Sequence, residues 1–111
     1  MTTQCPPDPL AFIAGCVRGG RILWTYHVNM RLLVRRIDRT TVLAGVDTFE
    51  LIEAYPDDKY LPSYLVLSWV AGEPLHILFA TDVPGDNVRI VTAYRPDPQD
   101  WTDHFARRSA P

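Results

Sequence analysis

Histidine and arginine side chains in two parts of the chain have the chemistry of a polar functional site. His27, Arg31 and Arg35 recur at every fourth residue, so a helix would align them in one basic ridge. Further along, His76 and Arg89 interrupt two otherwise apolar runs. Imidazole titrates near neutral pH and can transfer protons, and guanidinium groups pair with phosphates and carboxylates. The elements that carry these five residues decide whether they can meet.

Two apolar, β-branched runs, residues 75–81 and 88–94, flank a turn sequence and predict a β-hairpin. The turn, residues 82–87, contains the Asp, Pro, Gly and Asn residues that a reversing chain uses. Strict alternation places one apolar set on the core face, namely Ile77, Phe79, Val88 and Ile90. The other face then carries His76, Leu78, Ala80, Arg89, Val91 and Ala93. A sheet covered on one side would leave His76 and Arg89 on its open face.

The basic ridge belongs to a predicted helix over residues 26–36, which follows a short strand over residues 21–25. Thr25 can cap this helix. The apolar residues expected to face the core follow helical spacing, namely Tyr26, Met30, Leu33, Val34 and Ile37. A second helix is expected from Asp38 to about Asp47, with inward-facing Val42, Leu43 and Val46.

Further elements are expected on both sides of this region. Residues 49–55 and 63–70 predict two strands, joined by an exposed connection. A final helix is expected from Asp97 to Arg108, in which Trp101 and Phe105 share one side. Residues 1–20 are expected to form an N-terminal arm, partly irregular, with a short helix over residues 9–17 that is appended to the core.

The predicted fold is α+β, in the order β-α-α-β-β-β(-α), with the helices packed on one face of an antiparallel sheet. A chain of 111 residues that is 47% hydrophobic can enclose one core, so residues 21–108 are expected to form a single domain. Two cysteines without a CxxC pair or a histidine cluster predict free thiols, no metal site and no cofactor. A zinc site built from His27, His76 and a cysteine would lack local ligand spacing.

Charge is segregated along the chain, although its net value is only -2. Residues 18–39 contain six arginines and one acid, whereas residues 47–59 contain five acids and one lysine. Separate basic and acidic surfaces are therefore expected, while the net charge gives no overall attraction to nucleic acid or to an anionic membrane. A coding bias towards arginine is the alternative reason for ten arginines beside one lysine.

The chain is expected to be cytoplasmic. No apolar run approaches the roughly 20 residues of a membrane span. The sequence Ile13-Ala-Gly-Cys16 has the form of a lipoprotein cleavage box. The residues before Pro9 contain neither Lys nor Arg, however, so a lipoprotein signal is not expected.

Several short sequences resemble those of a bacterial family of unknown function: His27-x-x-x-Arg31, the strand of residues 50–55 followed by Pro56, Tyr64-Leu-Val-Leu, Leu75-His-Ile-Leu and Ile90-Val-Thr-Ala-Tyr-Arg-Pro-Asp97. Members of that family are often encoded beside zinc-finger antitoxins of the MqsA type, and the family is distantly similar to the RelE, MqsR and BrnT toxins. The resemblance covers about residues 21–108. It implies a RelE-like fold and a metal-independent endoribonuclease that an antitoxin protein restrains. The acidic pI and the single lysine depart from the strongly basic surfaces of those toxins.

Cleavage of RNA by such toxins needs a base for the ribose 2′-proton, cations for the charged phosphorane and an acid for the leaving oxygen. By their side-chain chemistry, His27 or His76 is the candidate base or acid, and the candidate phosphate-binding residues are Arg31, Arg35 and Arg89. Tyr94 would stack on a nucleobase or donate a proton. These roles require the basic ridge and the open face of the sheet to meet in one hollow.

Each of these residues also has an ordinary structural explanation. His76 can be a buried group that is hydrogen-bonded to the backbone, and His27 can donate to a neighbouring strand or acid. The arginines can pair with acids or stay solvated, and Tyr94 and Trp24 can belong to the core. The competing function is a non-catalytic protein-interaction or homodimerisation module with complementary basic and acidic surfaces. A small-molecule site between helices and sheet is a third function.

Overall fold

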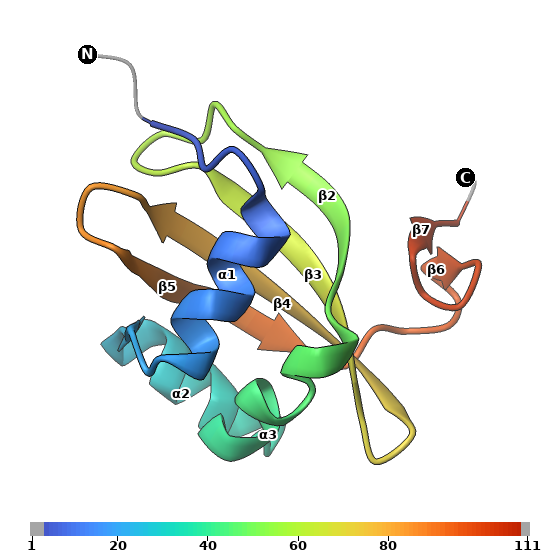
Figure 1. Cartoon of the computed structure of the whole chain (residues 1–111). Helices are drawn as coiled ribbons and strands as arrows, with labels where there is room; N and C mark the ends of the chain where they lie inside the picture. The colour runs from blue at the N-terminus through green and yellow to red at the C-terminus, as the bar shows by residue number, and fades with distance from the viewer. Residues whose placement is uncertain (1–3, 110–111) are drawn as a thin grey trace.

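The chain folds into helices packed on a largely antiparallel sheet, which confirms the predicted α+β class (Figure 1). The computed structural model describes residues 4–109. Its elements in chain order are α1 (Pro9–Arg18), β1 (Ile22–Trp24), α2 (Tyr26–Arg35), α3 (Arg39–Ala44), the 3-10 turn η1 (Val46–Thr48), β2 (Glu50–Tyr55), β3 (Ser63–Val70), β4 (Glu73–Asp82), β5 (Asn87–Tyr94), β6 (Trp101–Thr102) and β7 (Arg107–Arg108).

The five-stranded sheet has the order β1-β5-β4-β3-β2. Strands β2 to β5 form an antiparallel meander, and β1 pairs in parallel with β5 at one edge. Helices α2 and α3 connect β1 to β2, which lies at the opposite edge. The second predicted helix is shorter than expected, because α3 ends at Ala44 and η1 follows it.

The core lies between α1 and one face of the sheet. Four residues point into it as the alternation predicts, and all are fully buried: Ile77, Phe79, Val88 and Ile90. Ile13 and Cys16 of α1 are equally buried in the same cluster, and Figure 1 shows α1 lying across the sheet. The N-terminal helix is therefore present, but the expectation that it is appended to the core is wrong. This apolar sheet face needs a cover, and α1 supplies it.

Helix α2 begins where predicted, with the hydroxyl of Thr25 accepting a hydrogen bond of 3.1 Å from the amide of Val28. Its buried residues are Val28 and Leu32, so the predicted core-facing side of this helix is wrong. The exposed apolar residues are Tyr26, Met30, Leu33 and Val34. Ile37 is buried as predicted, because Arg36 ends the helix in a left-handed conformation (φ 56°) and the chain changes direction there.

The predicted C-terminal helix is wrong, because its residues form the small hairpin β6–β7. Asp103, His104 and Phe105 at its tip all have left-handed backbone angles (φ 54°, 55° and 69°), which a right-handed helix excludes. The ring centroid of Trp101 lies 4.3 Å from that of His76, and the centroid of Phe105 lies 6.0 Å from that of Trp69. The hairpin therefore covers part of the sheet face opposite α1.

Candidate functional site

A β-bulge decides which side chains of β5 share the second face of the sheet. Leu78 pairs with Thr92, but the next residue, Phe79, pairs with Ile90. The extra residue reverses the alternation beyond it. Ala93 consequently points into the core and is fully buried, so its predicted place on the open face is wrong. On that second face Arg89 lies opposite Ala80, and Tyr94 lies opposite His76.

His76 is fully buried at the end of this face that the C-terminal hairpin covers. Its Nδ1 atom lies 3.2 Å from the hydroxyl of Tyr94, and its Nε2 atom lies 2.9 Å from the carbonyl oxygen of Phe105. Burial lowers the pKa of His76, because it disfavours the charged imidazolium. The expected meeting of His27 with His76 is therefore wrong, and His76 is a buried histidine with both ring nitrogens satisfied.

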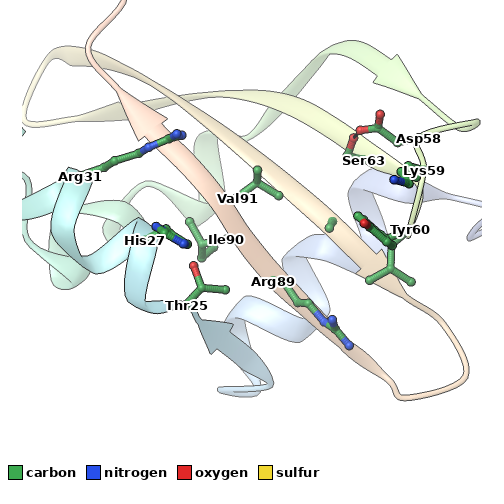
Figure 2. Close-up of a pocket in the computed structure, with 12 residues that line it drawn as sticks. Thr25, His27, Arg31, Asp58, Lys59, Tyr60, Ser63, Arg89, Ile90 and Val91 are labelled. Atoms are coloured by element: carbon green, nitrogen blue, oxygen red, sulfur yellow. Dashed lines mark hydrogen bonds between the residues drawn. The ribbon is translucent and has the colours of Figure 1, made fainter.

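The other end of the same face contains a pocket of about 490 Å³. Helix α2 forms one wall with His27 and Arg31, and the β2–β3 connection forms another with residues 58–61. Between these two walls lie Arg89 and Val91 on β5 (Figure 2). Ala80 of β4 also lines it, and His76 lies four residues earlier on that strand, about 13 Å away at strand spacing. The pocket thus contains three of the six predicted site residues.

Positive charge dominates this pocket. Arg31, Lys59 and Arg89 line it together with His27, against the single acid Asp58. The carboxylate of Asp58 accepts a hydrogen bond from Ser63, and Arg89 lies 3.6 Å from Asp82 in a partly exposed ion pair. Within residues 4–109, the side chains of Arg31 and His27 form no hydrogen bond and no ion pair, although both residues lie in α2. These groups can therefore pair with an external anion.

Two residues of the pocket were missed in the sequence, because the connection between β2 and β3 was expected only to be exposed. Lys59 and Tyr60 lie on that connection beside the pocket, with the Lys59 ammonium 5.2 Å from the Tyr60 ring centroid. The Tyr60 side chain is 78% exposed, which leaves an aromatic face available for stacking. The signal in the sequence was the single lysine of the chain next to a tyrosine in a Pro-flanked segment.

The remaining predicted site residues do not line the pocket. Arg35 instead ties α2 to the sheet, because its Nη1 atom donates to the Thr92 hydroxyl and to the Ala93 carbonyl oxygen, each at 2.9 Å. Tyr94 is half-buried beside His76, and burial raises the pKa of its phenol. The guanidinium group of Arg108 opposes that rise only in part. Both residues support the fold around β5.

Comparisons with known proteins identify one family. A family model described as Domain of unknown function (DUF4258) matches residues 24–95, a range that contains every residue lining the pocket. No curated protein and no solved structure matches the chain. In the described part of the chain, no three His, Cys, Asp or Glu side chains are grouped to hold a metal ion. None of the helices within residues 4–109 has the length and apolar character to cross a membrane.

Proposed function

This chain belongs to the Domain of unknown function (DUF4258) family, and from the residues of its pocket we propose that it is a metal-independent endoribonuclease. The observation that carries the proposal is that His27, Arg31, Lys59 and Arg89 line one solvent-open pocket. A proton-transferring imidazole beside several fixed cations is the combination that phosphodiester cleavage without a metal requires.

The substrate that fits this pocket is single-stranded RNA. Arg31 on α2 and Arg89 on β5 can both contact a backbone phosphate in the pocket, and Tyr60 offers a face for an unpaired base. The resemblance to the RelE, MqsR and BrnT toxins supports RNA over other phosphate esters. It also supports a cytoplasmic location and an antitoxin protein as the restraining partner.

The proposed reaction is an attack by a ribose 2′-oxygen on the neighbouring phosphorus. His27 accepts the 2′-proton as the new bond to phosphorus forms, and Arg31 and Arg89 stabilise the charge that gathers on the phosphorane oxygens. The bond from phosphorus to the 5′-oxygen then breaks, and Lys59 or Tyr60 supplies the proton that this oxygen takes up. The products are a 2′,3′-cyclic phosphate and a free 5′-hydroxyl. His76, which the hairpin covers, and the half-buried Tyr94 beside it take no part.

The test compares cleavage of a short single-stranded RNA with cleavage of its 2′-O-methyl analogue, in the presence of a chelator. The unmodified RNA should yield cyclic phosphate ends, and the analogue should stay intact because it lacks the attacking hydroxyl. The double variant His27→Ala/Arg31→Ala should lose about 10²-fold or more in rate. Intact RNA after incubation with the wild-type chain would contradict the proposal.

A matched control guards against contaminating ribonuclease. His104→Asn/Arg107→Ala removes the same two side-chain types from the C-terminal hairpin, outside the pocket. Asn is chosen because it tolerates the left-handed angle at position 104. This variant should cut RNA at the wild-type rate. Equal rates for the pocket variant and the control would show that the activity comes from elsewhere.

A further inference from the structure

Helix α2 exposes a continuous apolar stripe to solvent. Its four side chains keep large exposed fractions: Tyr26 74%, Met30 43%, Leu33 71% and Val34 79%. At 3.6 residues per turn they fall along one side of the helix, away from the buried Val28 and Leu32. In the described part of the chain, half of the eight large hydrophobic residues that are exposed belong to this one stripe. Such a cluster is typical of a binding surface.

Cations border the stripe on both sides. The basic ridge of His27, Arg31 and Arg35 lies next to it on the pocket side, and Arg36 follows on the other side at the end of the helix. Helix α2 itself contains no acidic residue. A molecule that covers the stripe therefore meets apolar side chains in the middle and positive charge at the margins.

We infer that this face of α2 docks an amphipathic helix of another protein, whose apolar stripe is flanked by Asp or Glu residues. An apolar ridge on the partner would bury the stripe, and carboxylates beside it would pair with the bordering arginines. Since His27 and Arg31 also line the pocket, the partner would cover one pocket wall. The docking itself does not depend on the proposed ribonuclease activity.

Charge argues against a second copy of this chain as the partner. A two-fold axis that pairs two antiparallel α2 helices through their stripes would place each basic ridge against its own copy. Parallel pairing would bring the ridge of one copy towards Arg36 of the other. Like charges in direct opposition disfavour both arrangements.

The experiment uses two synthetic helical peptides with the same leucine stripe, one flanked by glutamates and one by lysines. Titration calorimetry with the full chain should detect binding of the glutamate peptide and at least tenfold weaker binding of the lysine peptide. Added salt should weaken the first interaction by screening it. Equal binding of both peptides, or binding of neither, would overturn the inference.

Variants of the chain locate the surface. The double variant Leu33→Ser/Val34→Ser should bind the glutamate peptide at least tenfold more weakly than the wild-type chain. The control variant Leu23→Ser should bind it with wild-type affinity, because Leu23 is an exposed apolar residue of β1 outside the stripe. Wild-type affinity for the stripe variant would overturn the inference. The inference would also be overturned if the wild-type chain formed a dimer that the stripe variant does not form. Displacement of the glutamate peptide by anionic lipid vesicles would overturn it as well. The stripe variant should still cut RNA at the wild-type rate, so failure of docking and failure of the proposed function remain distinguishable.

Discussion

The Nε2 atom of His76 lies 2.9 Å from the carbonyl oxygen of Phe105, and this contact joins the sheet to the C-terminal hairpin. Burial lowers the pKa of His76 below its ordinary value of 6.5, so the unfolded chain binds this proton more readily than the folded chain does. The stability that neutral His76 contributes is therefore complete above pH 6.5. It is lost as the pH falls towards the folded-state pKa.

We expect the free energy of unfolding, measured in urea, to be smaller at about pH 5.5 than at about pH 7.5. Replacing His76→Gln should remove most of that difference, because the titrating group is gone. Glu53 does not confound this window: burial raises its pKa, but hydrogen bonds from Arg108 and Tyr55 outweigh that effect and leave its pKa below the ordinary 4.5. His104→Asn serves as the control and should keep the wild-type difference. An unchanged difference in His76→Gln would contradict this assignment.

Arg31 and Arg35 lie one turn apart on α2 but have different roles. Arg35→Ala removes two hydrogen bonds that hold α2 to β5, and it should lower the free energy of unfolding by about 1–2 kcal/mol. Arg31→Ala should change it by less than about 0.5 kcal/mol, since no partner within residues 4–109 is lost. Chemical denaturation of both variants checks this difference. Similar losses in both would mean that Arg31 also supports the fold.

Two glycines should respond to alanine in opposite directions. A Cβ atom at Gly45 would overlap the hydroxyl of Ser68 and lie 2.8 Å from the carbonyl oxygen of Trp69, so Gly45→Ala should destabilise the fold by about 1–3 kcal/mol. A Cβ atom at Gly15 in α1 would meet nothing within 4 Å. Gly15→Ala should therefore stabilise the fold by about 0.5–1 kcal/mol through helix propensity. Thermal unfolding of the two variants should shift the midpoint in opposite directions.

The N-cap residues that precede α2 and α3 allow the contribution of a capping hydrogen bond to be compared. Thr25 accepts a hydrogen bond from the amide of Val28, so Thr25→Ala should cost about 1 kcal/mol of stability. Asp38 occupies the same position before α3 without a side-chain hydrogen bond, and Asp38→Ala should cost less than about 0.5 kcal/mol. Urea titration measures both. A larger loss at Asp38 than at Thr25 would contradict the capping geometry.

Helix α2 was predicted in position but not in orientation, for a physical reason. Its sequence contains two apolar sides, one of Val28 and Leu32 and a longer one that includes Met30 and Leu33. Periodicity favours the longer side. The structure buries the shorter side in the core, and Arg35 next to it bonds to β5. Such a long-range contact is not visible in local spacing.

The site was predicted in part because only some of its determinants are local. His27 and Arg31 share a helix side, and Arg89 follows strand alternation, so spacing placed the first two in one ridge and the third on the open sheet face. That these two surfaces meet in one pocket depends on the packing of α2 against the sheet, which spacing does not show. Tyr94 depends on the bulge in β5, which adds one residue that alternation does not count. Trp101 and Phe105 suit a helix or a hairpin equally well, and their contacts with the sheet decide between them.

Both faces of the sheet rely on segments that lie outside the family match. That match runs from Trp24 to Arg95, so it omits α1, which supplies Ile13 to the core, and the hairpin that places Trp101 against His76. A recombinant fragment trimmed to residues 24–95 would leave apolar sheet surface in contact with water on both sides, and it should aggregate on expression. A truncated chain for biochemical work should therefore keep both α1 and the C-terminal hairpin, although both lie outside the family match.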